Sequence, residues 1–296
     1  MQLLAYILVY PFLLLISILP FRLFYLFSDI VYIIVYYVIR YRKKTVVNNL
    51  KLVFPEKSDI EIKQIQKRFY KHMCDMFLEM IKSISISEQQ LNKRFIIKNP
   101  EELKRLEALN KSVIVTYGHY ASYEWSVVVV NNISFKGFGV YKRIANTYFD
   151  ALVKRIRTKY NTTLIHTREA ISKITKSEAE GQKSMIAFLS DQSPKNFKTS
   201  YWSEFMGIQV PCFTGGEKLA KKLDLSVTYL KIEKVKRGYY EATLVPLTDN
   251  IKMCDDFEIT NKFLQELELQ IHKTPEYYLW THKRWKHKDK YHLRKK

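Results

Sequence analysis

Residues 112–125 read SVIVTYGHYASYEW, and this stretch decides the fold class. The apolar run that ends at Tyr117 predicts a strand. Gly118 permits a sharp turn after it, and Ser122 is a residue type that often caps the start of a helix. A strand, a tight turn and a helix in succession are the unit from which parallel α/β sheets are built.

The same alternation continues along the chain. Further strands are predicted at 137–141, 163–165, 184–190, 225–232 and 239–246, and helices at 147–160, from 168, from 214 and at 256–272. Gly and Pro number only 8 each, which argues against an all-β chain with many tight turns. The sequence therefore predicts an α/β fold with a mainly parallel central sheet flanked by helices.

An amphipathic helix is predicted before the first strand. Ser58 and Glu61 have the spacing of a capping box, and apolar residues then recur at intervals of three and four as far as Ile81. The pattern predicts a helix of about six turns whose apolar face packs into the core.

Two apolar stretches open the chain. Residues 3–19 contain no charge, and residues 23–39 are interrupted only by Ser28 and Asp29. A membrane span needs about 20 predominantly apolar residues, so either the first stretch crosses a membrane or the two form a hairpin or interfacial pair around Pro20. A buried helix of the soluble core is the alternative for the second stretch. Because a signal peptide would need a basic start and a small-residue cleavage site, we expect the anchor to be retained.

Positive charge follows the apolar block and dominates the whole chain. The cations directly after the block are Arg40, Arg42, Lys43 and Lys44. Such residues mark the cytoplasmic end of a span. Lysine and arginine outnumber aspartate and glutamate by 49 to 29, and the formal net charge of +20 favours nucleic acid, anionic lipid or an acidic carrier protein as partners. The three widely spaced cysteines predict neither a disulfide framework nor a metal site, and favour a reducing compartment.

His119 and Glu124 are the residues that point to chemistry. Ligands of open α/β sheets bind beyond the carboxyl ends of the strands, and His119 lies just past such an end. Imidazole has a resting pKa near neutrality and can take the proton of a hydroxyl nucleophile. If His119 lies in the loop before the helix, Glu124 can bind its other ring nitrogen and stabilise the imidazolium. A structural role for the histidine is the alternative at this point.

Further short motifs accompany this pair over almost the whole chain. They are Val140-Tyr-Lys-Arg143 followed by 146–150, Arg168 ahead of a helix, Asp191-Gln-Ser-Pro194, Phe205-Met-Gly207 with Pro211, Thr214-Gly215, and residues 278–286 (YLWTHKRWK). In order and spacing, these motifs and the hydrophobic N-terminus resemble the lipid A biosynthesis (lauroyl/myristoyl) acyltransferase family. This family belongs to the lysophospholipid acyltransferase superfamily, whose signature is HX4(D/E). The chain departs from the family's usual His-Phe-Gly-Asn-Trp-Glu at Ala121, Ser122 and Tyr123, which bears on the acceptor more than on the chemistry.

The resemblance implies a glycerol-3-phosphate acyltransferase-like fold and a specific reaction. A fatty acyl group would move from an acyl thioester to a hydroxyl of a lipid A precursor or related saccharolipid. The donor would be acyl carrier protein or acyl-coenzyme A, with the acyl group on a phosphopantetheine thioester and no other cofactor. His119 would be the general base and Glu124 its orienting partner. The enzyme would lie at the cell inner membrane, with its catalytic domain on the cytoplasmic side.

The resemblance also implies a set of substrate-binding residues. They are Arg143, Arg168, Asp191, Gln192, Thr214 and Gly215. Guanidinium groups suit bidentate phosphate contacts, so Arg143 and Arg168 would bind phosphate on the acceptor or on the phosphopantetheine arm, unless they are merely solvated charges. Asp191 would orient loop backbone or a neighbouring histidine, or be a simple turn residue. Thr214 and Gly215, at a helix start, would receive an anion or form a plain cap.

Three regions are predicted along the chain. A membrane anchor with a basic juxtamembrane segment occupies 1–44, the acyltransferase domain 45–281, and a basic tail 282–296. The tail interleaves aromatic and basic residues, which in isolation suggests nucleic acid. An anionic membrane surface or an acidic carrier protein accounts for the same charge, and we expect no nucleic-acid partner. Two alternatives stay open: acyl transfer to an aminolipid or lysophospholipid, and a catalytically silent lipid-binding membrane module.

Overall fold

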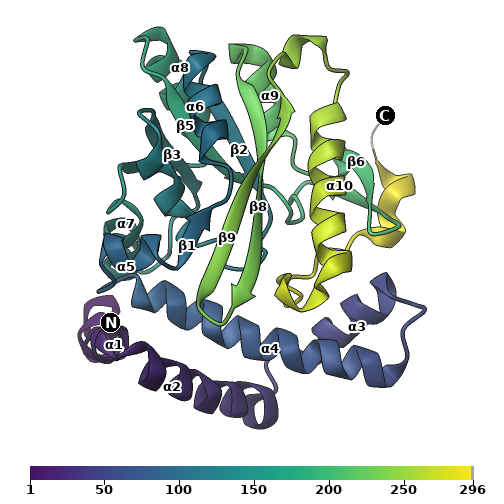
Figure 1. Ribbon diagram of the computed structural model, residues 1–296. Coiled ribbons are helices and arrows are strands. Elements are labelled where there is room, and N and C mark those ends of the chain that lie inside the picture. The colour runs from purple at the N-terminus through teal and green to yellow at the C-terminus, as the bar shows by residue number, and fades with distance from the viewer. Residues whose placement is uncertain (295–296) are drawn as a thin grey trace.

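A seven-stranded sheet forms the centre of the computed structural model, which describes residues 1–294 (Figure 1). Its strand order is β1-β9-β8-β2-β5-β3-β4. The strands are β1 (Phe95–Ile97), β2 (Val113–Tyr117), β3 (Lys136–Tyr141), β4 (Thr162–His166), β5 (Ser184–Leu189), β8 (Ser226–Lys236) and β9 (Tyr239–Thr248). Neighbouring strands pair in parallel except for the antiparallel hairpin of β8 and β9. The predicted α/β fold with a mainly parallel sheet is confirmed.

Helices cover both faces of this sheet (Figure 1). The α-helices are α1 (Gln2–Ile18), α2 (Phe21–Ile33), α3 (Lys43–Val53), α4 (Asp59–Lys82), α5 (Glu88–Asn92), α6 (Pro100–Ala108), α7 (Thr147–Arg157), α8 (Ala170–Ala179), α9 (Gly215–Leu223) and α10 (Glu258–Lys273). A π-helical segment, η1 (Ile34–Ile39), extends α2, and short 3₁₀ helices are η2 (Trp125–Asn132), η3 (Phe197–Thr199), η4 (Ile251–Met253), η5 (Pro275–Tyr277) and η6 (Lys288–Leu293).

Strand β2 is buried on both faces. Val115 and Tyr117 belong to the same core cluster as the valines of η2, whereas Ile114 belongs to a second cluster with residues of α8 and α9. Successive side chains of a strand point to opposite faces, so a strand covered on both sides reads as a continuous apolar run. This explains the sequence pattern that ends at Tyr117.

Most predicted elements are present with boundaries shifted by a few residues. The helices predicted at 147–160 and 256–272 are α7 and α10. The helix predicted from Ser122 is wrong, because a 3₁₀ helix begins only at Trp125. This helix contains four consecutive valines, 127–130, whose β-branched side chains disfavour a regular α-helix.

The start of α4 confirms the capping box. The Ser58 hydroxyl accepts the backbone N–H of Glu61 at 3.4 Å, and the Glu61 carboxylate accepts the backbone N–H of Ser58 at 2.8 Å. The helix runs for 24 residues. Ile65, Phe69 and Met73 are all buried in the main core, as the spacing predicts.

A small antiparallel hairpin lies outside the main sheet and was not predicted as strands. It consists of β6 (Tyr201–Phe205) and β7 (Ile208–Cys212). Met206 and Gly207 connect them with φ of 55° and 73°. Positive φ at both central residues is typical of a two-residue hairpin turn. The Phe205-Met-Gly207 motif therefore marks a turn.

The two N-terminal helices lie along the outer side of α4, away from the sheet (Figure 1). The helix formed by α2 and η1, Phe21–Ile39, has 19 residues and a mean hydropathy of 1.7, so it is long and apolar enough to cross a membrane. α1 is a shorter apolar helix of 17 residues. The predicted N-terminal apolar helix of spanning length is thus present.

Candidate active site

The ends of two neighbouring strands bring His119 and Asp191 together. β2 and β5 are parallel, with Tyr117 paired to Leu189, and each site residue lies two positions beyond its strand. Oδ1 of Asp191 lies 2.6 Å from Nδ1 of His119, and Oδ2 accepts the backbone N–H of His119 at 3.1 Å. One carboxylate therefore holds both the imidazole ring and the loop that carries it.

The other ring nitrogen of His119 faces Gln192. The two Nε2 atoms lie 3.3 Å apart. When Nδ1–H donates to Asp191, Nε2 of the neutral ring carries no proton and accepts from the Gln192 amide. The His119 side chain is 15% exposed, and its ring packs edge-on against Tyr123 with 4.8 Å between centroids. Nε2 can therefore act on a substrate that displaces the amide.

The charges around His119 favour its protonated form. Burial alone lowers the pKa of His119, but the charge and hydrogen bond of Asp191 outweigh burial and raise this pKa above its ordinary value. Burial also raises the pKa of the Asp191 carboxyl, yet contact with His119 reverses the shift and leaves the pKa lowered. The pair is an ionised carboxylate beside an imidazole that readily accepts a proton.

Glu124 does not bind His119. Its Oε1 accepts from Nη2 of Arg157 at 2.6 Å, and its Oε2 accepts from Nε of the same guanidinium at 3.1 Å. Among residues 1–294 no hydrogen bond joins Glu124 to the imidazole, so the predicted orienting contact is corrected: Asp191 makes it. Ala121, with φ of 50°, turns the chain sharply between the two residues, and Glu124 comes to lie beside α7. The Glu124 charge still contributes to the raised pKa of His119.

An apolar pocket adjoins the site beneath the strand ends. Its volume is about 90 Å³. Its walls come from alternate residues of β2 and β5, from η2, and from β3 and β4, and include Val115, Tyr117, Val127, Val130, Gly139, Leu164, Ala187 and Leu189. Tyr123, which contacts the His119 ring, also lines it, together with the Glu124–Arg157 ion pair. The pocket thus combines one ion pair with hydrocarbon walls, as a site for an apolar chain with a polar end requires.

Arg143 and Arg168 lie on the same edge of the sheet as His119. β3 and β4 are parallel with Tyr141 paired to His166, and each arginine lies two positions beyond its strand. Both side chains are exposed, and neither forms an ion pair within the described part of the chain. Two exposed guanidinium groups at the strand ends suit an anionic ligand.

Thr214 and Gly215 occupy the start of α9, which packs on the other face of the sheet. The Thr214 side chain makes no capping hydrogen bond. Glu217, in the first turn, accepts from the backbone N–H and the hydroxyl of Thr260 at 2.9 and 2.6 Å. A carboxylate already lies at this helix end, and the anion-binding role of Thr214 and Gly215 stays a prediction.

Sequence reasoning missed how the chain after α10 braces the loops that carry His119 and Asp191. The carbonyl oxygen of His119 accepts from Leu279 at 3.1 Å, and the Ser193 hydroxyl donates to the carbonyl oxygen of Arg284 at 2.7 Å. His282 accepts the Ser193 backbone N–H at 3.3 Å, and burial lowers the pKa of His282 to about 4. Arg284, assigned to the tail, is fully buried and donates to the carbonyl oxygen of Pro211 at 2.9 Å. The last two residues of that predicted tail, 295–296, lie outside the described residues.

Arg157 was also missed. It follows Lys154 and Arg155 in the last turn of α7, and nothing in the local sequence separates it from these two cations. Only the fold shows that it is three-quarters buried and bound to Glu124.

Comparison with known proteins decides the family. The profile of bacterial lipid A biosynthesis acyltransferases matches residues 1–287. The chain belongs to this family. It is therefore an acyltransferase. Two curated members are each 22% identical to it over 243 residues, which cover 80% of this chain and 76% of theirs. They are a lipid A biosynthesis palmitoleoyltransferase of Escherichia coli (strain K12) and a lipid A biosynthesis acyltransferase of Shigella flexneri.

Family membership confirms the resemblance seen in the sequence. The match extends from the first N-terminal helix through the buried Arg284 and Trp285, so it includes the apolar helices, the sheet and the segment that braces the loops of His119 and Asp191. The name of the Escherichia coli relative specifies a palmitoleoyl group for that protein.

Proposed function

We propose that this acyltransferase moves a fatty acyl group from a thioester on acyl carrier protein to a hydroxyl of a lipid A precursor or related saccharolipid. The observation that carries the proposal is the His119–Asp191 pair, whose Nε2 lies at the end of two buried strands beside an apolar pocket. A pocket of this kind can receive part of the acyl chain, and the pair can activate a hydroxyl.

His119 acts as the general base in this scheme. Nε2 takes the proton of the acceptor hydroxyl while the hydroxyl oxygen attacks the thioester carbonyl. A carbon–oxygen bond forms, the carbon–sulfur bond breaks, and the proton passes from Nε2 to the departing thiolate. Asp191, 2.6 Å from Nδ1, stabilises the imidazolium during the transfer.

The remaining site residues would bind and position the two substrates. Glu124 holds the Arg157 guanidinium at the wall of the pocket. Once a substrate displaces the Gln192 amide from Nε2 of His119, this amide would bind the reacting hydroxyl or carbonyl. Arg143 and Arg168 would bind phosphate on the acceptor or on the phosphopantetheine arm. Thr214 and Gly215 would receive a second anionic group at the start of α9.

Charge supports the proposed donor and location. A net charge of +20 suits an acidic carrier protein and an anionic membrane surface, and offers no reason to invoke nucleic acid. The cations after the apolar N-terminal block suit the anionic cytoplasmic leaflet of the inner membrane, which supports this location for the catalytic domain.

Acyl transfer by the purified full-length protein tests the proposal. The protein in detergent is incubated with acyl carrier protein bearing a labelled acyl group and with a saccharolipid acceptor, and the product is identified by mass spectrometry. We expect one added acyl group, loss of product in His119→Ala, and no change in His292→Ala, which alters an exposed histidine of the tail. Absence of product from every saccharolipid would overturn the proposal.

The alternative acceptor is tested in the same assay. The altered residues Ala121, Ser122 and Tyr123 lie two to four positions after His119, and Tyr123 lines the pocket. An aminolipid or lysophospholipid is therefore supplied in parallel. If product forms only from these lipids, the acceptor is an aminolipid or lysophospholipid instead of a saccharolipid, and the proposed role of His119 as the base is unchanged.

A further inference from the structure

The outward face of the N-terminal helices is apolar along its whole length. On α2 and η1 its exposed residues recur every three or four positions: Leu23, Leu26, Ile30, Ile33 and Tyr37. On α1 they are Leu3, Leu4, Ile7, Leu8, Val9, Phe12, Leu14, Leu15 and Ile18. We call these residues the apolar face. Leu26 is 60% exposed, which is costly for a leucine in contact with water.

The polarity of α2 is inverted relative to a helix on a water-exposed surface. Ser28 is fully buried, and its hydroxyl donates to Asp75 of α4 at 2.7 Å. The Tyr25 hydroxyl donates to Glu79 of α4 at 2.8 Å. A helix between protein and water turns its polar side outward, whereas α2 turns its polar side to the protein. The medium outside α2 is therefore apolar.

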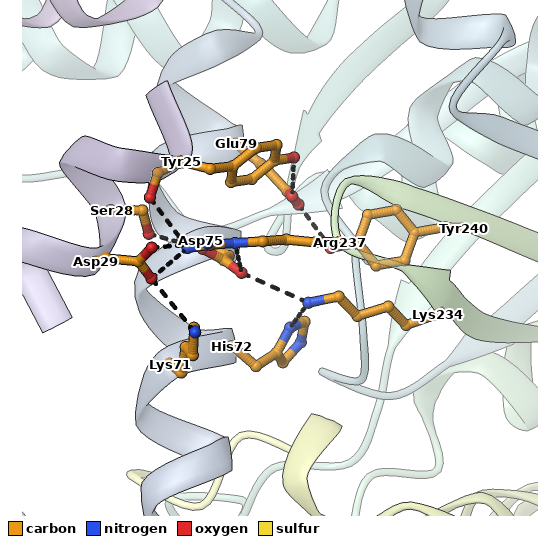
Figure 2. Close-up of polar contacts among 10 residues, drawn as sticks. All are labelled: Tyr25, Ser28, Asp29, Lys71, His72, Asp75, Glu79, Lys234, Arg237 and Tyr240. Atoms are coloured by element: carbon orange, nitrogen blue, oxygen red, sulfur yellow. Dashed lines mark hydrogen bonds and ion pairs between the residues drawn. The ribbon is translucent and has the colours of Figure 1, made fainter. Parts of the chain in front are cut away.

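A partly buried ion network fastens α2 to the body of the protein that contains the sheet (Figure 2). Arg237, from the turn between β8 and β9, donates to the two carboxylate oxygens of Asp29 at 2.9 and 2.8 Å and to Asp75 at 2.7 Å. Lys71 lies 3.6 Å from Asp29, and Lys234 lies 3.6 Å from Asp75. We call Asp29, Asp75 and Arg237 the ion lock. Asp75 is 1% exposed, so pulling α2 away would break bonds that water cannot readily replace.

The contacts fix the direction of α2. From Tyr25 of α2 to Tyr36 of η1, the partners on α4 run backward from Glu79 to Gln66, so this helix and α4 lie antiparallel and side by side. α4 carries exposed cations: Lys63, Lys67 and Lys71. These cations require water or lipid head groups. A helix that lies lengthwise against α4 cannot also run across the hydrocarbon core.

We propose that α1, α2 and η1 lie in the plane of one leaflet of an anionic membrane, and that the chain does not cross the membrane through them. The apolar face enters the acyl region of the leaflet, and the ion lock faces the protein. Crossing would instead place Asp29, near the middle of Phe21–Ile39, in hydrocarbon without Arg237. This inference concerns the anchor and does not depend on the proposed reaction.

Charge at both ends of the helix supports an anionic leaflet as the occupant. The exposed cations that flank the apolar stretch of α2 and η1 are Arg22, Arg40, Arg42 and Lys44. The last three line a surface hollow of about 530 Å³ with Tyr37, which has the size and charge for a lipid head group. Interfacial helices bind by buried apolar area together with attraction to anionic lipid.

Cysteine labelling from each side of the membrane tests the topology. Gln2→Cys, Arg22→Cys and Arg40→Cys are made separately in the full-length protein carrying Cys254→Ser, because Cys74 and Cys212 are buried. Lys252→Cys, exposed on the catalytic body, marks the body side. A membrane-impermeant maleimide is applied to inverted and to right-side-out vesicles.

We expect all four cysteines to react from the same side. If Arg22→Cys and Arg40→Cys react from opposite sides, α2 spans the membrane; if Gln2→Cys and Arg22→Cys do, α1 spans it. Either result overturns the inference. Labelling needs no activity, so one-sided labelling of a protein that transfers no acyl group would overturn only the proposed function.

Hydrogen exchange tests the ion lock itself. Asp29→Asn removes one of the two carboxylates bound by Arg237, and we expect amide exchange in α2 to become at least about tenfold faster in vesicles. Asp289→Asn, which removes an exposed carboxylate paired with Lys288, is the matched control and should leave α2 unchanged. Equal exchange in Asp29→Asn and the unmodified protein would show that the lock does not hold α2.

Discussion

The exchange Asp191→Asn tests the assignment of the orienting carboxylate. Asparagine has nearly the same shape and keeps a carbonyl oxygen for the backbone N–H of His119. Its amide nitrogen, however, faces the ring with donors where the carboxylate accepts. Nδ1 must then accept, so the ring proton moves to Nε2, where it blocks the base.

The expected loss can be worked from the contacts. Asp191 makes two charge-assisted hydrogen bonds to His119, at 2.6 and 3.1 Å, and each such bond contributes about 1.5–3 kcal/mol. Losing the shorter bond together with the correct tautomer should raise the barrier by about 4 kcal/mol. At 1.36 kcal/mol for each tenfold change, kcat should fall roughly a thousandfold.

The pH profile gives a second measure of the same change. Asp191 raises the pKa of His119, so its removal lowers this pKa, and the unprotonated base persists to lower pH. The acid limb of the plot of kcat/KM against pH should therefore move toward acid in Asp191→Asn. A purely structural defect would lower the rate without moving the limb.

Single-turnover acyl transfer, followed by mass spectrometry, measures both effects. Glu124→Gln is the comparison, because the sequence favours Glu124 as the orienting group. Since Arg157 can still bond to a neutral amide, we expect Glu124→Gln to cost only about tenfold. If Asp191→Asn keeps more than about a tenth of the activity while Glu124→Gln abolishes it, the assignment of Asp191 is refuted. Thermal unfolding of both variants checks that each is folded.

Three further changes probe the pocket, the exposed arginines and the buried carboxyl of Glu79. Ala187→Leu fills most of a pocket of about 90 Å³ and should shift the donor preference toward shorter acyl chains. Competition between labelled donors measures this preference. An unchanged preference would exclude this pocket as the acyl site. Arg143→Ala with Arg168→Ala should raise the acceptor KM about tenfold with kcat preserved, and a fall in kcat alone would contradict a binding role. Burial raises the pKa of the Glu79 carboxyl from 4.5 to about 7. The protonated carboxyl therefore stabilises the folded state below about pH 4.5, and this stabilisation is lost as the pH rises through about 7. Glu79→Gln should flatten that dependence, by roughly 3 kcal/mol in the free energy of unfolding between pH 4.5 and 8, as followed by urea denaturation.

The sequence predicted the strand that precedes His119 because the pattern there is local. A buried strand, a glycine turn and a histidine follow one another in residues 112–119, and the structure has them in that order. The partner of the histidine is not a local property. Asp191 follows β5, and β5 lies beside β2 although two strands and three helices separate them along the chain.

Strand order is what the sequence could not supply. Parallel strands may be joined in several orders by crossover helices, and only pairing of β2 with β5 places the two residues beyond Tyr117 and Leu189 in contact. The nearby Glu124 was the reasonable local candidate, but its partner, Arg157, also comes from a distant element. Short-range spacing therefore predicted the position of His119 beyond a strand end and assigned its ring contact to Glu124. The role that the resemblance implied for Asp191, orienting loop backbone or a neighbouring histidine, matches the structure.

For the N-terminal helices, too, the sequence predicted the local element but not its distant contacts. Apolar length predicted a membrane-seeking segment, and the structure has one helix of spanning length in Phe21–Ile39. Whether such a helix crosses or lies flat depends on what its polar residues contact. The two interruptions of the apolar stretch, Ser28 and Asp29, are bound by α4 and by the β8–β9 turn, which no hydropathy pattern reports.

The order of strands along the sheet edge also bears on the acceptor. His119, Asp191, Arg143 and Arg168 follow the neighbouring strands β2, β5, β3 and β4, in that order. Adjacent strands lie about 4.8 Å apart, so the backbone positions of Arg143 and Arg168 lie roughly 10 and 14 Å from that of His119 along this edge. In a lysophospholipid only a few bonds separate the free hydroxyl from the phosphate, so it could place the hydroxyl at His119 and the phosphate at an arginine only where that side chain extends back along the edge. A disaccharide with phosphate on the ring that does not react spans such a distance, so the spacing of the strand ends favours a saccharolipid as the acceptor.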